Sequence, residues 1–194
     1  EEREAVETMT ELIEYYKGIF TILSSCASRQ LEEVTFRRTV IPVQELLDAA
    51  GKYFKKSMKN RSERIELEIE PMEAKVIGDV NQLRFLLENL IDEALTVRED
   101  GVIRLQARQD NEYIRFLFTD TRREKSVEEL NQLFYPNLAR MTSGEKGELR
   151  GTEYLVCKQI IRDHDEFAGR RGCRINAEPA EGGGFTVYFT IPRR

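Results

Sequence analysis

Two stretches of alternating apolar and polar residues, VIRLQARQ (102–109) and YIRFLFTD (113–120), are separated only by Asp110, Asn111 and Glu112. Alternation with a period of two is the pattern of a half-buried strand, and so short a connection makes two strands pair as an antiparallel hairpin. A second pair of strand patterns, CRINAEP (173–179) and FTVYFTIP (185–192), flanks the turn AEGGG. The chain must therefore build a sheet that contains antiparallel pairs.

Segments with the helical period lie between and before these strands. They are 43–59, 80–98, 126–134 and 152–164, and shorter strand patterns occur at 64–71 and 74–79. Ser126 with Glu129 three positions later is a capping box, which marks the start of a helix. This order predicts an α+β fold, a two-layer sandwich in which helices cover one face of a mixed sheet and the other face is polar. The segment 135–150 is polar and long for a loop, which is typical of a functional lid or a mobile connection.

Residues 1–33 have the pattern of one long helix. Apolar residues recur at alternating spacings of three and four, as in the seam of a heptad repeat, and a second apolar row beside the seam widens this face. The seam is Val6, Met9, Ile13, Tyr16, Phe20, Leu23 and Ala27, and the second row is Leu12, Ile19 and Cys26. A widened face favours a helical bundle formed with a second copy of the chain. The alternative is a helix that lies on its own domain.

Composition excludes several classes of function. Thirty basic and 35 acidic residues leave a net charge of −5, which argues against a nucleic-acid-binding protein. The sequence contains no apolar run long enough to span a bilayer and no signal peptide. Since it begins with Glu1, we expect a fragment of a longer protein. We expect it to be cytoplasmic, or the cytosolic part of a membrane-anchored protein, without direct membrane contact of its own.

The cysteines and the single histidine suggest no catalytic or metal site. Cys26, Cys157 and Cys173 are widely spaced and form no C-x-x-C motif, which indicates reduced thiols rather than a zinc site or disulfides. His164 is the only histidine, and no G-x-S-x-G motif accompanies it. We therefore expect His164 to be structural.

Four stretches resemble segments of one known family, the ATPase domain of histidine kinases in the GHKL superfamily. GDVNQLRFLLENLIDEAL (78–95) resembles its N-box, EELNQLFYP (128–136) its F-box, and KQIIRDH (158–164) and GGGFTVYFTIP (182–192) its closing helix and strands. The resemblance covers about residues 36–192 and implies the Bergerat form of the sandwich. Residues 1–35 then resemble the second helix of a kinase dimerisation bundle, followed by an ATPase domain at 36–194. HDEFAGRRGCRIN is also similar to degenerate kinase-like domains of Bacteroides-type bacteria, some of which carry tetratricopeptide repeats.

The nucleotide site that this resemblance implies has altered chemistry in its N-box. The family places two asparagines four residues apart on one helix face, where they meet ATP phosphates and Mg²⁺. Asn89 matches the first, and Glu93 replaces the second. A carboxylate binds Mg²⁺ but also brings negative charge beside a triphosphate. We expect Asn89 and Glu93 to form an altered nucleotide and magnesium site, and the alternative is a solvated helix edge.

The adenine-binding motif is altered as well. The family's D-x-G-x-G, whose aspartate accepts a hydrogen bond from adenine, appears here as DTRRE, with Asp120 kept and Arg122 and Glu124 in place of the glycines. Such side chains fill space that glycine leaves open, although an arginine also pairs well with phosphate. Thr186 matches a family threonine near adenine, or is an ordinary strand threonine.

A third altered motif lies at the end of the segment that corresponds to the family's lid. Gly151 is kept there, and Glu153 replaces the next glycine. An acid in the first turn of a helix satisfies the N–H groups and the dipole that would otherwise hold phosphate. Two of the three altered motifs thus add negative charge at positions that meet ATP in the family.

These changes predict a sensor histidine kinase-like signalling domain with a degenerate ATP site. It would be a pseudokinase that dimerises through residues 1–33 and acts by protein contacts, with a response regulator or a neighbouring domain as partner. ATP and Mg²⁺ are cofactors only if the site is functional. The alternative is an active ATP-dependent protein histidine kinase of a two-component phosphorelay, with its phosphoacceptor histidine upstream of this chain.

The stretch DEFAGRR after His164 has no counterpart in the family's pattern, in which the helix turns through two glycines into the next strand. It places Phe167 among charges and gathers Arg170, Arg171 and Arg174. An exposed aromatic residue with arginines is typical of a docking surface. The alternative is a longer solvated loop with Phe167 at the edge of the core.

Overall fold

The computed structural model describes residues 36–135 and 152–194, together with residues 6, 9, 13, 142, 143, 149 and 150. The chain divides into two compact units. The larger unit consists of residues 36–135 and 153–194, and the smaller one of residues 1–35 and 136–152.

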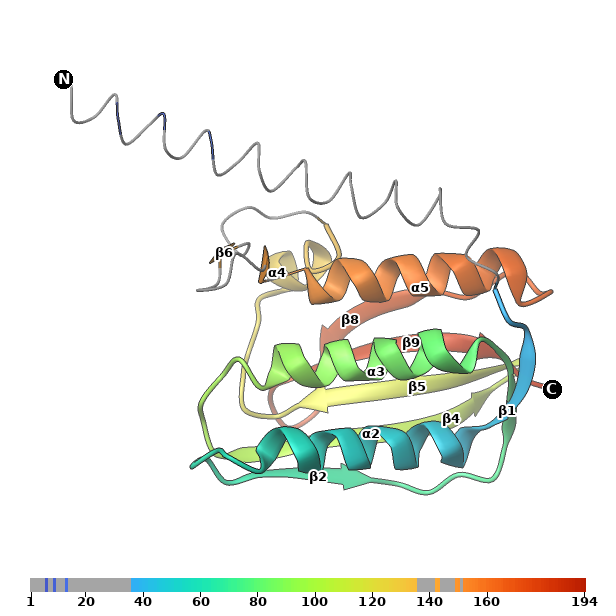
Figure 1. The fold of residues 1–194 in the computed structure, drawn as a ribbon, viewed down its shortest axis with the longest axis horizontal. Coiled ribbons are helices and arrows are strands. Elements are labelled where there is room, and N and C mark those ends of the chain that lie inside the picture. The colour runs from blue at the N-terminus through green and yellow to red at the C-terminus, as the bar shows by residue number, and fades with distance from the viewer. Residues whose placement is uncertain are drawn as a thin grey trace. The chain divides into compact units, whose positions relative to one another are not determined.

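The larger unit is built on a five-stranded sheet in the order β2-β4-β5-β9-β8 (Figure 1). Its strands are β2 (Ile65–Ile69), β4 (Gly101–Asp110), β5 (Tyr113–Asp120), β8 (Ile175–Pro179) and β9 (Phe185–Pro192). β2 is parallel to β4, and the other neighbouring pairs are antiparallel, so the sheet is mixed and both predicted hairpins are present. Asn111 closes the first hairpin at a φ of 53°, a left-handed conformation that asparagine tolerates better than most residues.

Three helices cover one face of this sheet: α2 (Val43–Met58), α3 (Val80–Ala94) and α5 (Glu153–Phe167) (Figure 1). Each buries one apolar stripe, and in α3 the buried residues include Leu83, Leu86, Leu87, Leu90 and Ile91. The sheet contributes alternate side chains, and the rings of Phe116 and Phe189 stack with centroids 4.8 Å apart. The predicted α+β sandwich with a mixed sheet is therefore confirmed.

The short helix α4 (Val127–Asn131) begins with the predicted capping box. The backbone N–H of Glu129 donates to Ser126 Oγ at 3.1 Å, and the backbone N–H of Ser126 donates to the Glu129 carboxylate at 2.8 Å. Two free donors at the helix start are thereby satisfied.

A second, two-stranded sheet is not predicted by the sequence, although the predicted strand at 74–79 is confirmed as one of its two strands. β1 (Thr39–Pro42) pairs antiparallel with β3 (Lys75–Gly78), and Ile41 lies opposite Val76 in the core. The sequence around β1 lacks clear alternation, and Pro42 suggests an interruption. In the structure Pro42 is the last residue of the strand, where its missing N–H costs no ladder bond.

His164 and Asp79 tie the start of α3 to the end of α5. Asp79 caps α3, its Oδ1 accepting the backbone N–H groups of Asn81 at 3.0 Å and Gln82 at 3.1 Å. The backbone N–H of Asp79 donates to His164 Nε2 at 3.1 Å, and His164 Nδ1 lies 2.8 Å from the carbonyl oxygen of Ile160. Because a backbone N–H can only donate, Nε2 is the acceptor and Nδ1 carries the proton. The geometry thus gives this buried, neutral histidine a structural role.

Three helix ends differ from the predicted ones by three or more residues. α3 ends at Ala94 rather than near residue 98, α4 ends at Asn131 rather than at residue 134, and α5 continues past His164 to Phe167. The first three residues of the stretch DEFAGRR therefore form the last turn of α5 rather than part of a loop. Helix ends depend on contacts from other elements as much as on local sequence, and one such contact is described below for α3.

In the smaller unit, the described residues of the N-terminal segment are Val6, Met9 and Ile13, which are helical and 63%, 63% and 51% exposed. The rest of the predicted heptad seam lies outside the described residues. In the predicted lid, β6 (Thr142–Ser143) pairs antiparallel with β7 (Leu149–Arg150). Within the part of the chain that the structure describes, no helix has the length and apolar character needed to cross a bilayer.

The buried His164 predicts a loss of stability in mild acid. Burial lowers the pKa of His164 below its ordinary value of 6.5, against the opposing effect of the Ile160 carbonyl. As the pH falls below about 6.5, the unfolded chain takes up this proton and the folded chain does not, so acid favours unfolding. The stabilisation is complete above that pH and declines towards about pH 5, before most carboxylates titrate.

We therefore expect the melting temperature of the wild type to fall from about pH 7 to about pH 5. His164→Gln should be less stable at neutral pH and should show a flatter dependence over the same interval. Thermal unfolding followed by circular dichroism measures both. An equally steep slope in His164→Gln would contradict the assignment.

Candidate functional site

The predicted site residues of the N-box lie on the C-terminal half of α3. Asn89 and Glu93 are one helical turn apart, as the spacing requires. Asn89 is 9% exposed, and its amide nitrogen donates to the carbonyl oxygen of Phe85 at 2.7 Å. Glu93 is also largely buried, with a side chain 16% exposed, so the alternative of a solvated helix edge does not describe it.

Asp120, the last residue of β5, is surrounded by arginine donors. Its Oδ1 accepts the backbone N–H of Arg122 at 3.0 Å and Arg122 Nε at 2.9 Å. Its Oδ2 accepts Arg122 Nη2 at 2.9 Å and Arg123 Nε at 3.1 Å. The side chains of Asp120 and Arg122 are only 2% and 1% exposed. In the family this aspartate accepts a hydrogen bond from adenine. Here both of its carboxylate oxygens already accept hydrogen bonds from the same chain.

The guanidinium group of Arg122 also closes the C-terminal end of α3. Its Nη2 donates to the carbonyl oxygen of Ala94 at 2.6 Å, and its Nη1 to those of Val97 at 3.3 Å and Glu99 at 3.1 Å. Ala94 is the last residue of α3, where the partial negative charge of the helix end attracts a cation, and Val97 and Glu99 follow the helix. This contact joins the chain at and after the end of α3 to the end of β5.

Arg123 connects Asp120 to Glu93. Besides its bond to Asp120, it forms a bidentate pair with Glu93, with Nη1 to Oε1 at 3.2 Å and Nη2 to Oε2 at 2.7 Å. Tyr154, in the first turn of α5, donates its hydroxyl to Glu93 Oε2 at 2.6 Å. The guanidinium group of Arg123 also lies 5.4 Å from the ring centroid of Phe185. Four charged side chains of zero net charge therefore fill the space between α3, the end of β5 and the start of α5.

The charge states of this network follow from its burial and pairing. Burial alone would raise the pKa of Asp120, but the hydrogen bonds from Arg122 hold it below its ordinary value. Burial alone would lower the pKa of Arg123, but the bond to Glu93 raises it above the ordinary value. Burial and the neighbouring Glu93 raise the pKa of Tyr154 well above its ordinary value. At neutral pH Arg123 and Asp120 are ionised, and Tyr154 is a neutral donor.

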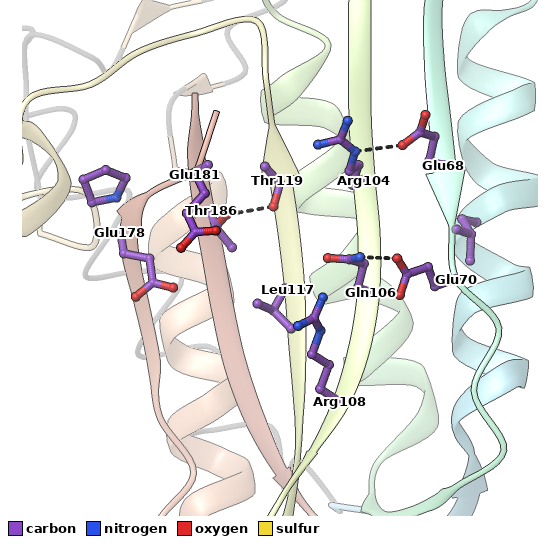
Figure 2. A pocket seen from close by; sticks show the side chains of 13 residues that line it. Glu68, Glu70, Arg104, Gln106, Arg108, Leu117, Thr119, Glu178, Glu181 and Thr186 are labelled. Atoms are coloured by element: carbon purple, nitrogen blue, oxygen red, sulfur yellow. Dashed lines mark hydrogen bonds and ion pairs between the residues drawn. The ribbon is translucent and has the colours of Figure 1, made fainter. Parts of the chain in front are cut away.

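Thr186 does not join this network. It lies opposite Thr119 in the sheet, and their hydroxyl oxygens are 2.7 Å apart (Figure 2). Asp120 and Phe185 form the next cross-strand pair, and successive residues of a strand point to opposite faces. Thr186 therefore lies on the face without helices, which agrees with the alternative of an ordinary strand threonine, and its role as a nucleotide-binding residue stays a prediction.

The face that carries Thr186 is hollowed into a cleft of about 760 Å³ (Figure 2). Arg104 and Glu68 pair across it at 2.8 Å, and Gln106 donates to Glu70. Leu117, Thr119 and Thr186 contribute to its lining. This polar surface agrees with the predicted polar face of the sheet and is separate from the network around Asp120.

Phe185 is the residue of β9 that lies opposite Asp120. Gly184 precedes it at a φ of 83°, and a Cβ there would lie 2.1 Å from the carbonyl oxygen of Asp120. A glycine is required for this close approach, and the approach sets the position of Phe185. Strand alternation puts Phe185 on the same face as Val187, Phe189 and Ile191. Because all four are apolar, the sequence pattern would have placed Phe185 on the helix-covered face.

The third altered motif is described in part. Gly151 lies outside the described residues. Glu153 begins α5, and its Oε2 is buried without a hydrogen-bond partner among the described residues. The carboxylate therefore occupies the first turn of the helix, as the sequence predicts.

Sequence reasoning missed Arg123, Tyr154 and Phe185 as members of the site. Arg123 lies between two altered glycine positions, and its pairing with Glu93 follows only from the way β5 ends beside α3. Tyr154 and Phe185 were missed because each of them fits an ordinary helix or strand pattern. No group of three or more His, Cys, Asp or Glu side chains within the described residues is arranged to hold a metal ion.

As arranged, residues at the positions predicted to hold ATP and Mg²⁺ are bonded to one another. A magnesium ion on Glu93 would have to displace the Arg123 pair, because both carboxylate oxygens are engaged. An adenine on Asp120 would have to displace Arg122 from a fully buried position. Chemically, the arrangement holds two helices and a strand end together by charge-assisted hydrogen bonds.

Comparison with known proteins gives one family. The sequence profile described as "Histidine kinase-, DNA gyrase B-, and HSP90-like ATPase" matches residues 78–194. No curated protein matches the sequence.

Solved histidine kinases share the fold. The catalytic domain of histidine kinase ThkA is 21% identical with a TM-score of 0.63, over 81% of this chain and 96% of that chain. The mycobacterial sensor histidine kinase MprB is 20% identical with a TM-score of 0.62, over 81% and 99%. Full-length ShkA in complex with AMPPNP is 16% identical with a TM-score of 0.61, over 83% and 32%. A complex of ThkA with the response regulator TrrA also matches, at 19% identity and a TM-score of 0.62, over 97% and 52%.

Removal of Arg122 should destabilise the fold strongly. Arg122→Ala leaves Asp120 with Arg123 as its remaining cation and leaves the carbonyl groups at the end of α3 without this donor. Breaking a buried pair from one side costs about 3–5 kcal/mol. The matched control is Arg104→Ala, because Arg104 also pairs with a carboxylate at 2.8 Å but its side chain is 45% exposed. An exposed pair contributes about 0–1 kcal/mol.

Urea unfolding at neutral pH measures both free energies of unfolding. Similar small losses in the two variants would show that the Asp120–Arg122 pair contributes no more than an exposed one, contrary to this prediction.

Proposed function

Because the chain belongs to the histidine kinase-, DNA gyrase B-, and HSP90-like ATPase family, we propose that it is a signal-transduction domain of a sensor histidine kinase-like protein whose ATP site is degenerate. It acts as a pseudokinase, by dimerisation and protein contacts rather than by phosphoryl transfer. The observation that carries this proposal is the buried Asp120–Arg122 pair, since the adenine-binding aspartate of the family is here bound by an arginine of the same chain.

The Glu93–Arg123 pair supports the same proposal at the phosphate end of the site. In the family this position holds an asparagine that contacts Mg²⁺. A carboxylate that is already paired and hydrogen-bonded loses these bonds when it takes up a metal ion, and it repels phosphate when it is not neutralised. Glu93 and Arg123 therefore replace a metal site by an internal ion pair.

A domain that stays folded without a nucleotide can present a constant surface to a partner protein, as signalling by protein contacts requires. The strong internal pairing keeps α3, β5 and α5 together when no ligand is bound. The proposed assembly is a homodimer through residues 1–33. A response regulator or a neighbouring domain is the proposed partner, since ThkA, with the same fold, was solved with its response regulator.

The second candidate, an active ATP-dependent histidine kinase, keeps support from Asn89 and Asp120. Both match family positions that contact the nucleotide, and the arginines could pair with phosphate if they left the carboxylates. This function requires the network to open at the expense of several buried charge-assisted hydrogen bonds. It also requires a phosphoacceptor histidine outside this chain, since His164 is buried beneath Asp79.

Calorimetric titration tests the nucleotide site directly. With ATP and Mg²⁺ added to the full chain, we expect no binding in the micromolar range, because adenine and metal must each displace a buried arginine. ShkA, solved with AMPPNP, is the positive control under the same conditions. Micromolar affinity for this chain would refute the pseudokinase proposal and favour the active kinase.

Assembly is tested by changes on and off the heptad seam. Light scattering should give a dimer for the full chain and a monomer after removal of residues 1–33. Ile13→Lys, on the seam, should weaken the dimer because it places a charge in an apolar contact. Glu11→Lys, off the seam, is the matched control and should leave the dimer intact. A monomeric full chain at high concentration, or a dimer that survives the deletion, would contradict the proposal.

A further inference from the structure

A group of arginines gathers at the end of the larger unit that lies away from the Asp120 network. Its members, called here the arginine end, are Arg38, Arg170, Arg171, Arg193 and Arg194. They come from the segment before β1, the loop after α5 and the end of β9. In Figure 1 these three places lie together at the end marked by β1 and the C-terminus.

Contacts among the described residues confirm that these segments meet. Arg38 lies against Gly169, where an added Cβ would be 2.7 Å from the guanidinium carbon. Arg170 Nη1 contacts Glu112 Oε2 at 2.5 Å, and the carbonyl oxygen of Glu112 accepts the backbone N–H of Arg193 at 2.9 Å.

Two acids neutralise only part of this charge. Glu112 pairs with Arg170, and Asp165 pairs with Arg171 at 3.3 Å. Asp165 also accepts the backbone N–H groups of Gly172 and Cys173, which fixes the loop that carries these arginines. Arg171 remains 74% exposed in its side chain despite its pair. Within the described ranges, Arg38, Arg193 and Arg194 make no ion pair.

An aromatic side chain lies within this basic surface. Phe167, in the last turn of α5, is 50% exposed, and its ring lies 5.8 Å from that of Phe36. Phe36 in turn packs edge-on against the buried His164 at 4.8 Å. Phe167 is therefore anchored from one side and presents the other side to solvent. An exposed anchored aromatic residue next to arginines has the composition of an interface centre.

We propose that the arginine end, with Phe167 at its centre, is a docking surface for an acidic protein segment that carries an apolar side chain. The chain as a whole has a net charge of −5, so this basic surface is opposite in sign to the net charge of the chain. Its cations are arginines, whose planar guanidinium groups bind carboxylates bidentately. The partner's carboxylates pair with Arg38, Arg171 and the arginines after β9, and its apolar side chain covers Phe167.

The surface is distinct from the nucleotide site. α5 runs from Tyr154, which contacts Glu93, to Phe167 at the arginine end, and its 15 residues span about 22 Å. The inference therefore does not depend on whether ATP binds, and it assigns the stretch DEFAGRR a role in partner recognition.

The test uses the full chain and a fluorescent peptide in which glutamates flank leucines, with a glutamine-for-glutamate peptide as the probe control. Fluorescence anisotropy should show binding of the glutamate peptide, weakened by salt, and binding of the glutamine peptide at least about tenfold weaker. Arg38→Glu combined with Arg171→Glu should weaken binding on the order of tenfold, and Phe167→Ala should also weaken it, with melting temperatures close to that of the wild type.

The matched control is Arg98→Glu, because Arg98 is 81% exposed and follows α3 at the other end of the unit. It should leave binding unchanged. Absence of glutamate-peptide binding, or an equal loss in Arg98→Glu, would overturn the proposal. Binding to phosphatidylserine vesicles but not to the glutamate peptide would also overturn it and assign the surface to anionic lipid. If the Phe167→Ala variant and the arginine variant both unfold, the loop is a structural element and the docking proposal is overturned.

Discussion

The buried pair between Asp120 and Arg122 is the contact on which the arrangement around the site depends. A carboxylate and a guanidinium group with almost no solvent exposure lose several kcal/mol of hydration each, so every donor and acceptor must be used. Asp120 accepts four hydrogen bonds, and Arg122 reaches three backbone carbonyls after α3. The same two side chains therefore hold together the end of β5, the end of α3 and the loop that follows α3.

The sequence departures from the family make physical sense as a set. Glu93 would be an unfavourable substitution beside phosphate, and Arg123 would be a buried cation without a partner. Together they form a bidentate pair, which Tyr154 completes from α5. Charge that the family obtains from a nucleotide and a metal ion is balanced here by side chains. A site that is paired within the chain in this way is consistent with the proposed pseudokinase function.

The same elements connect the two ends of the larger unit. α3 is capped at its start by Asp79, which His164 and Arg37 contact, and its last residue, Ala94, is bonded to Arg122. α5 begins beside Glu93 and ends at Phe167, next to the segment through which the chain enters the unit. Helix α5 thus connects the proposed docking surface at one end to the Asp120 network at the other.

The fold and the part of the site on α3 could be predicted, because they depend on residues that are close together in the sequence. Alternation and helical spacing predicted the two hairpins, the helices over one face and the capping box at Ser126. The four-residue spacing of Asn89 and Glu93 required one helix face. The strand pair of β1 and β3 escaped prediction, since its apolar contacts come from residues far apart in the chain.

What the tertiary structure decided is which charges meet. The sequence by itself determined that Glu93 and Arg122 stand at altered family positions, with Asp120 kept and Arg123 next to Arg122. It left open whether the arginines face phosphate, solvent or the carboxylates. It also left open which face of β9 carries Thr186, and the strand register put Phe185 beside Asp120 instead. Long-range pairing of charges depends on where a strand ends relative to a helix, and only the packed sheet and helices establish that geometry.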